Sequence, residues 1–315
     1  MKICVIGGTG FVGTHLVNEL VTQGHTVKVI TRRPERHRHL KTLPAIKIVS
    51  IDFFGNKILE RQIDTYDVVI NLAGILNSST HNSFEQVHEQ VAFRIAQATK
   101  AVGTPRLLHM SALNASDTAP SNYLRSKGRA QEKILAMNDD SFKVTVFSPS
   151  VIFGVGDSFF NKFAQLLSLM PISLPLACAK ARFAPVYVGD VVKAFIHAMD
   201  KPQTYGKNYP LCGPETFTLY ELVTYSAVQI HSRSRIIPLN NLLSKPLAWF
   251  MGMFLGAPIT LDHYQSMQVP SVCDNSDVYN ELGIVPHSIE AIVPQYLSGK
   301  ESAGQMDYYR SIANR

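Results

Sequence analysis

Short apolar runs alternate with longer segments of helical period along the first half of the chain. Between the runs, Phe11–Gln23 and Ser83–Val102 repeat apolar residues at three- and four-residue steps, and each is followed by a glycine that stops a helix. The runs are continuous and rich in β-branched residues, as in strands covered on both faces, and span Lys2–Ile6, Val27–Ile30, Ile46–Ser50, Asp67–Asn71, Arg106–Met110 and Lys143–Phe147. The pattern predicts an α/β fold of the Rossmann type, a doubly wound parallel sheet with its ligand crevice at the carboxyl ends of the strands.

The alternation loosens after Pro149. Further helices are predicted at Ser158–Leu169, Asp190–Met199, Thr218–Ile230 and Ser288–Leu297, with short strands between them. We expect residues 1–150 to form a dinucleotide-binding core. Residues 151–315 are expected to complete this core and to add a small α+β lobe on the substrate side. Asp190 is expected to cap the helix that follows it.

A glycine-rich turn, GGTGFVG at residues 7–13, joins the first strand to the first helix. Gly7 permits a tight turn, Gly10 lets the backbone approach a pyrophosphate, and Gly13 lets the helix pack close to the sheet. The free N–H groups of the helix's first turn then face the phosphates. The turn therefore predicts a dinucleotide site that is formed by Gly7, Thr9, Gly10, Phe11, Val12 and Gly13.

The end of the second strand indicates which dinucleotide binds. A site for NAD normally places a carboxylate there for the ribose 2′-hydroxyl, whereas this chain has Thr31, Arg32 and Arg33. Two guanidinium groups can clamp a 2′-phosphate through charge-assisted hydrogen bonds. The cofactor expected is therefore NADPH/NADP rather than NAD, and the alternative is a solvated basic face without a ligand.

Two more loops at the same sheet edge are predicted to contact the cofactor. Asp52 follows the third strand and can either accept a hydrogen bond from the adenine amino group or cap its own loop. Leu72, Ala73 and Gly74 end the fourth strand, and the small residues Ala73 and Gly74 would let the backbone lie beside the ribose and phosphates.

Three side chains near the middle of the chain suggest catalysis. Tyr123 and Lys127 are four residues apart on a predicted helix, Tyr123–Met137, so the ammonium can approach the phenol. A nearby cation favours the phenolate, which makes the phenol usable as a general acid or base. Ser111 ends the fifth strand and would hydrogen-bond the same substrate oxygen. A reactive site is expected around Ser111, Tyr123 and Lys127.

The motifs GGTGFVG, NLAG, MSAL, YLRSK, SPSVIFG and FAPVYVGDVV together resemble the extended and atypical short-chain dehydrogenase/reductase superfamily. Within it, roughly residues 1–300 resemble the NADPH-binding accessory subunits of respiratory complex I and their free-standing bacterial relatives, of the NAD-dependent epimerase/dehydratase family. The resemblance implies the same glycine turn and catalytic set, with Lys127 also on the nicotinamide ribose. It further implies that the backbone at Pro149 and Val151 lines the nicotinamide.

Composition sets the remaining expectations. The formal charge is +6, from 30 Lys+Arg against 24 Asp+Glu, which fits an anionic cofactor and gives no reason to expect nucleic acid. The four cysteines are scattered, so neither a disulfide nor a metal site is expected and a reducing, cytoplasmic location is the default. No signal peptide is expected, because Met1 leads directly into a strand.

An uncharged stretch at Pro246–Leu261 complicates this assignment. It is shorter than the roughly 20 residues that span a bilayer, so we interpret it as a buried or partner-facing helix. The alternatives are contact with a respiratory complex and shallow contact with the inner face of the membrane.

The sequence leaves two functions open. One is an oxidoreductase that transfers hydride between NADPH and a carbonyl, or an epimerase/dehydratase that does so transiently. Its partner would be a small-molecule substrate, with an apolar, quinone-like compound as one class. The other is a non-catalytic NADPH-binding protein with a structural or redox-sensing role. Monomer and homodimer are both compatible with the sequence.

Overall fold

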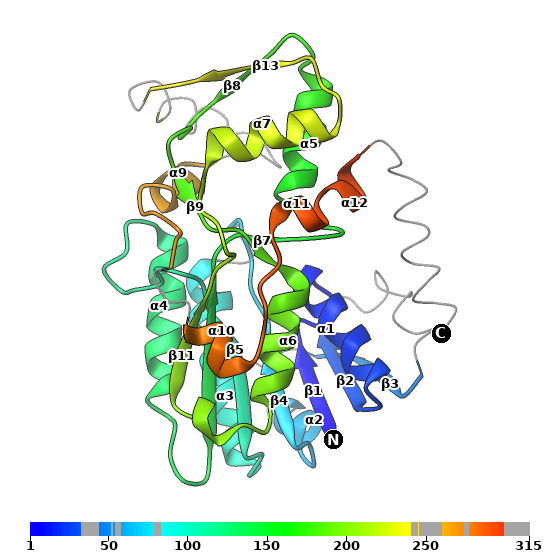
Figure 1. Ribbon diagram of the computed structural model, residues 1–315. Helices are drawn as coiled ribbons and strands as arrows, with labels where there is room; N and C mark the ends of the chain where they lie inside the picture. The colour runs from blue at the N-terminus through cyan, green and yellow to red at the C-terminus, as the bar shows by residue number, and fades with distance from the viewer. Residues whose placement is uncertain are drawn as a thin grey trace.

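The computed structural model describes residues 1–32, 44–51, 53, 58–78, 83–240, 245, 260–273 and 277–298. Its centre is a seven-stranded sheet in the order β11-β6-β5-β4-β1-β2-β3, and every neighbouring pair is parallel (Figure 1). The strands are β1 (Lys2–Ile6), β2 (Thr26–Thr31), β3 (Ile46–Ser50), β4 (Val68–Asn71), β5 (Arg106–Met110), β6 (Lys143–Pro149) and β11 (Lys207–Leu211). The chain order reverses between β1 and β4, which is where a doubly wound sheet opens a crevice for a ligand.

All six strands predicted from the sequence are confirmed, and β11 adds a seventh. The reason for their continuous apolar character is visible in β1. Ile3 and Val5 belong to the core on one face of the sheet, whereas Cys4 and Ile6 belong to the core on the other. A strand buried on both faces has no polar side to alternate with.

Helices cover both faces of the sheet (Figure 1). On one face α1 packs against α6, and their apolar residues share a core with β1 and β4. On the other face α2, α3 and α4 pack in sequence, together with a π-helix. The bounds are α1 (Phe11–Thr22), α2 (Ile58–Ile63), α3 (Ala92–Ala101), α4 (Asn122–Leu135) and α6 (Val188–Ala198).

The predicted helix Ser83–Val102 is not regular throughout. Its first part is the π-helix η2 (Glu85–Val91), which continues directly into α3. His88 on this π-helix is buried together with Val87 and Val91. π-helical turns are rare and occur frequently at functional sites.

A smaller lobe lies beyond the carboxyl ends of the strands (Figure 1). Its own core joins aromatic and aliphatic residues of α5, α7 and the last two helices. The elements outside the sheet layers are β7 (Ile152–Phe153), α5 (Phe160–Leu169), β8 (Ser173–Leu176), β9 (Arg182–Phe183), β10 (Val186–Tyr187), η3 (Pro202–Thr204), β12 (Phe217–Thr218), α7 (Leu219–Gln229), β13 (Arg235–Pro238), α9 (Leu261–Ser266), α10 (Asp277–Leu282), α11 (Ile289–Ile292) and α12 (Pro294–Leu297). The predicted division at residue 150 stays a prediction.

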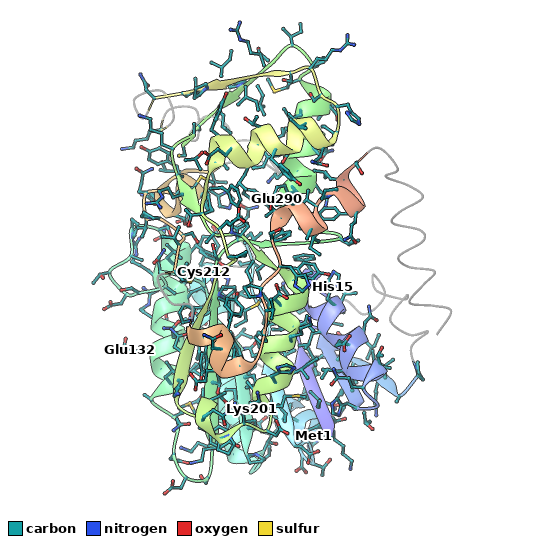
Figure 2. All side chains as sticks on the ribbon, viewed as in Figure 1. Met1, His15, Glu132, Lys201, Cys212 and Glu290 are labelled. Atoms are coloured by element: carbon teal, nitrogen blue, oxygen red, sulfur yellow. A yellow bond between two sulfur atoms is a disulfide. The ribbon has the colours of Figure 1, made fainter. Side chains whose placement is uncertain are left out.

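Two expectations from the sequence are wrong. Cys212 and Cys273 form a disulfide across 61 residues of sequence, with their Cα atoms 5.8 Å apart. Figure 2 shows Cys212 between the sheet and the lobe. The fold brings the end of β11 beside the segment after α9. This proximity cannot be predicted from the spacing of the cysteines in the sequence. The argument from cysteines for a reducing compartment therefore loses its basis.

The second error concerns Asp190. Helix α6 begins at Val188 and the residue before it is Tyr187, so Asp190 lies inside the first turn and does not cap the helix. Its buried carboxylate instead accepts hydrogen bonds from the backbone N–H of His287 at 2.7 Å and from Nδ1 of that ring at 2.8 Å. The role of Asp190 is still structural, because it ties α6 to the segment between α10 and α11.

The uncharged stretch Pro246–Leu261 lies almost wholly outside the described residues, of which it includes Thr260 and Leu261. Among the residues that the structure describes, no helix is both long and apolar enough to cross a membrane.

Candidate functional site

The glycine turn folds tightly against the ends of two neighbouring strands. Gly7 has a φ of +80°, and its N–H donates to the Ile30 carbonyl at 3.1 Å. Gly10 N–H then returns to the Gly7 carbonyl at 3.0 Å. The hydroxyls of Thr9 and Thr31 lie 3.1 Å apart, which joins the turn to the end of β2.

The packing around the three glycines distinguishes their roles. A Cβ at Gly13 would lie 2.4 Å from the Gly7 oxygen, and one at Gly7 would lie 2.9 Å from the Leu72 carbonyl carbon. Both positions therefore need glycine for the fold itself. A Cβ at Gly10 would meet only the Gly7 oxygen, at 3.4 Å, so the described protein atoms leave room above Gly10. That space is where a pyrophosphate approaches in this architecture.

A cavity of about 540 Å³ opens above the turn, within the volume range of small-molecule and cofactor sites. Four strand ends or loops and the helix η2 meet in it, and its lining residues are Ile6, Gly7, Thr9, Gly10, Ile30, Thr31, Arg32, Phe53, Leu72, Ala73, Gly74, Val87 and Val91. The predicted residues Arg33 and Asp52 lie outside the described residues. Phe11, Val12 and Gly13 form the first turn of α1 behind the cavity.

Asn71 shapes the wall of the cavity at the end of β4. Its Oδ1 accepts from the Ala73 N–H at 3.0 Å, and its Nδ2 donates to Nδ1 of the buried His109 at 3.1 Å. These bonds hold the turn that presents Leu72 and Gly74 to the cavity. Sequence reasoning found this loop but not the polar pair that supports it.

Ser111 and Lys127 come together at the end of the neighbouring strand β5, and Tyr123 lies one helical turn before Lys127 on α4. Lys127 is 3% exposed, and its Nζ donates to the Met110 carbonyl at 3.0 Å. A Cβ at Gly74 would lie 3.3 Å from that same Nζ, so the ammonium stands at the wall of the cavity. Ser111 follows Met110 directly, and its buried Oγ has no hydrogen-bond partner among the described residues.

The protonation state of the Tyr123 phenol differs from the one predicted from the sequence. Burial, followed by the charge of Asp262, raises the pKa of the Tyr123 phenol to about 12. Burial lowers the pKa of Lys127 to about 8. The predicted shift of the phenol toward phenolate is therefore wrong for the protein without ligand, because burial and the charge of Asp262 both favour the protonated phenol. At neutral pH the phenol keeps its proton and Lys127 is charged.

His88 supports this group and was missed from the sequence. Its Nε2 accepts from the Ile75 N–H at 3.0 Å, so Nδ1 carries the proton and donates to Ser126 Oγ at 2.9 Å. Ser126 Oγ in turn donates to the Tyr123 carbonyl at 2.8 Å. The ring also lies edge-on to the Tyr123 ring, with centroids 5.3 Å apart. The one signal in the sequence that could have indicated this role of His88 is its position beside Val87 on an apolar helix face.

Pro149 and Val151 lie where β6 ends, next to the end of β5. The Pro149 carbonyl accepts from the Leu113 N–H at 2.9 Å, and the Val151 carbonyl accepts from the Val186 N–H at 2.9 Å. The first bond ties the Ser111 loop to β6, and the second ties β6 to the lobe.

Taken together, the loops fit a dinucleotide with its phosphates on the glycine turn. The basic end of β2, the open space above Gly10 after β1 and the unpartnered Ser111 Oγ after β5 follow one another along the sheet edge. Arg32 would approach the adenosine ribose end, Gly10 the pyrophosphate, and Lys127 the nicotinamide ribose end.

Comparisons with known proteins agree with this architecture. The 40 kDa subunit of NADH-ubiquinone oxidoreductase from Neurospora crassa is 27% identical over 308 residues, which are 96% of this chain and 80% of that protein. A ceramide reductase from Caulobacter vibrioides is 28% identical over 194 residues, which are 62% of this chain and 59% of that protein.

Among solved structures, UDP-glucuronic acid 4-epimerase from Bacillus cereus, in complex with UDP-glucuronic acid and NAD, superposes with a TM-score of 0.71. The sequences are 15% identical, and the superposition covers 100% of this chain and 99% of that one, which establishes a shared fold. The family model of NAD dependent epimerases and dehydratases matches residues 3–212. Because this match spans well over half of its 315 residues, the chain belongs to the NAD dependent epimerase/dehydratase family, with the Rossmann-type fold of the short-chain dehydrogenases/reductases.

Proposed function

We propose that the chain is an NADPH-dependent oxidoreductase that reduces a carbonyl. The residues that would hold the cofactor are Gly7, Thr9, Gly10, Thr31, Arg32, Arg33, Asp52, Leu72, Ala73, Gly74, Lys127, Pro149 and Val151. Arg32 and Arg33 would bind the 2′-phosphate through charge-assisted hydrogen bonds. When bound, NADPH supplies the hydride.

The chain's own residues then handle the substrate oxygen. Ser111 Oγ would donate a hydrogen bond to the carbonyl and orient it. Tyr123 would give its proton to the same oxygen as negative charge develops there, in the manner of a general acid. The charged Lys127 would favour the phenolate that remains. The same three groups serve an epimerase or dehydratase that returns the hydride.

The unpartnered Ser111 Oγ carries this proposal. A buried hydroxyl without a hydrogen-bond partner is unfavourable by about 1–3 kcal/mol, so such groups are few in a native protein. Here the hydroxyl follows Met110, whose carbonyl holds the ammonium of Lys127. A substrate oxygen at this point would satisfy the hydroxyl.

Replacing Tyr123 by Phe tests the catalytic role. We expect NADPH affinity to change by less than about threefold, and turnover to fall by about a hundredfold or more, because only the proton donor is lost. Candidate carbonyl substrates should include ketones, quinones and sugar nucleotides. Tyr220→Phe, a change on the exposed face of α7 in the lobe, is the matched control and should alter neither quantity. Equal turnover of wild type and Tyr123→Phe would refute the proposal.

A non-catalytic NADPH-binding role is the second candidate. The similarity to a subunit of NADH-ubiquinone oxidoreductase extends over 96% of this chain and favours it. In that case NADPH would stabilise the protein and no candidate substrate would be turned over. The Caulobacter relative, by contrast, is named as a reductase, and its named substrate is a lipid. That name supports a catalytic role with an apolar substrate, either lipid or quinone-like.

The proposal also includes contact of residues 246–261 with a membrane or with a respiratory complex. An apolar substrate would place the protein at the inner face of a membrane, and the similarity to a respiratory-complex subunit points to the same place. Co-sedimentation of the full chain with membranes, with and without residues 246–259, tests it.

A further inference from the structure

The short helix α9 lies against the N-terminal end of α4, far from it in sequence (Figure 1). Its start is fixed by a capping box, in which Thr260 Oγ1 accepts from the His263 N–H and His263 Nδ1 accepts from the Thr260 N–H, both at 3.3 Å. Nε2 of His263 therefore carries the proton and donates to the Leu76 carbonyl at 3.2 Å. The helix thus spans from the loop after β4 to α4.

Asp262 covers the free backbone groups at the start of α4. Its Oδ1 accepts from the Asn122 N–H at 2.7 Å, and its Oδ2 accepts from the Tyr123 N–H at 3.2 Å. These N–H groups belong to the first helical turn and have no partner within the helix. The negative charge also favours this position, because the helix dipole is positive there.

The third free N–H of that turn, that of Leu124, is linked to α9 through Ser121. Ser121 Oγ accepts from the Leu124 N–H at 3.2 Å and from Ser266 Oγ at 2.8 Å. Ser266 lies one turn after Asp262, so both side chains project from one face of α9. Helix α9 therefore holds two N–H groups of this turn directly and the third through the N-cap residue Ser121.

The segment that carries Asp262 is itself anchored. Asn114 Nδ2 donates to the Pro270 carbonyl at 2.8 Å, and Ser150 Oγ donates to the Ser271 carbonyl at 2.8 Å. Cys273 then closes the disulfide with Cys212. Asp262 is therefore a fixed group.

We propose that Asp262 is a positioning residue for the reaction proposed above, on which this inference rests: it fixes the backbone of Tyr123 and thereby the phenol relative to Ser111 and Lys127. Tyr123 is then held at both ends of its backbone. Asp262 binds its N–H, and the His88–Ser126 pair binds its carbonyl. A phenol held in this way needs no reorganisation when substrate arrives.

Asp262 also acts on the proton of the phenol. Its charge is the second cause, after burial, of the raised pKa of Tyr123. Lys127 lies one turn further along α4, and His88 on η2 faces the phenol ring. Burial lowers the pKa of His88 to about 2, so the imidazole is neutral. A carboxylate beside the phenol favours the protonated form, which is the form that donates to a carbonyl.

Asp262→Asn and Asp262→Ala separate the two effects. The amide keeps an acceptor for one backbone N–H and loses the charge, whereas alanine loses both. The matched control is Glu221→Gln, which alters a carboxylate that accepts from the Thr218 N–H at 2.7 Å in the capping box of α7. The full chain is labelled with 3-fluorotyrosine, whose phenol is more acidic than that of tyrosine and therefore titrates at a lower pH. The ¹⁹F signal of Tyr123 is assigned by its absence in Tyr123→Phe.

In Asp262→Asn we expect the Tyr123 signal to titrate at a pH lower by about one unit, with NADPH affinity changed by less than about twofold. In Asp262→Ala the signal should also move at pH 7, and kcat should fall by about tenfold or more with a smaller change in KM. Glu221→Gln should leave the signal in place. An unchanged Tyr123 signal in both Asp262 variants, or an equal change in Glu221→Gln, would overturn the inference. Absence of turnover in the wild type would refute the proposed function and leave the ¹⁹F result decisive for Asp262.

Discussion

At the scale of single residues, the candidate site contains a buried charge, the ammonium of Lys127, that is unfavourable for folding. Lys127 is 3% exposed, and its Nζ donates to the Met110 carbonyl at 3.0 Å. Burial lowers its pKa from 10.5 to about 8, so at pH 7 the folded state holds a proton that it binds less well than the unfolded chain does. A charged lysine in this position does not stabilise the fold, which is consistent with the role in ligand binding proposed for it.

Replacing Lys127 by Met should therefore stabilise the protein at pH 7. The lowered pKa corresponds to on the order of 3 kcal/mol, and loss of the bond to Met110 offsets part of it, so the unfolding free energy should rise by about 1–2 kcal/mol. In the wild type the penalty is complete below pH 8 and is relieved between pH 8 and 10.5, because there the unfolded state binds more protons. Urea unfolding from pH 7 to 10 measures both effects. A less stable variant at pH 7 would contradict them.

At the scale of elements, regular patterns were predictable and contacts made by single polar groups were not. The six strands of the sheet and the glycine turn follow from continuous apolar runs and from glycine spacing, because those signals are local. The π-helical turn at Glu85–Val91 depends on where His88 finds its partners, Ile75 and Ser126. The contact of Asp262 with Tyr123 joins residues that are 139 positions apart, so it cannot be predicted from any local sequence pattern.

The π-helix and the cavity wall are linked through His88. We expect His88→Leu to lower the unfolding free energy by about 1–3 kcal/mol, because the half-buried Ile75 N–H loses its acceptor and the buried Ser126 loses a partner. NADPH affinity should also fall, since Gly74 in the same loop lines the cavity. Glu85→Gln, on the exposed side of the same π-helix, is the control for both measurements. Unchanged stability in His88→Leu would show that the loop is held by other contacts.

At the scale of the whole molecule, the sheet and the lobe are joined around the candidate site. β11 is the edge strand of the sheet, and its end carries Cys212, whereas Cys273 follows the segment that covers α4. The disulfide therefore connects the dinucleotide-binding sheet to the segment that positions Tyr123. The scattered cysteines gave no sign of this link, since a pairing across 61 residues appears only in the folded chain.

Removing the disulfide should lower the stability of the whole molecule. For a loop of 61 residues the loss is expected to be about 2–4 kcal/mol in the double variant Cys212→Ser, Cys273→Ser. Chemical unfolding with and without a thiol reductant measures it. The reductant should destabilise the wild type by a similar amount and leave the double variant unchanged. Equal effects of the reductant on both proteins would contradict the pairing.

The most direct test of the account is a calorimetric titration of the full chain and of Arg32→Ala with NADPH and NADH at one salt concentration. We predict that the wild type binds NADPH at least about tenfold more tightly than NADH. Arg32→Ala should lose most of this difference with little change for NADH, because only the 2′-phosphate contact is removed. Equal or tighter binding of NADH by the wild type, or an equal loss for both nucleotides in Arg32→Ala, would contradict the account.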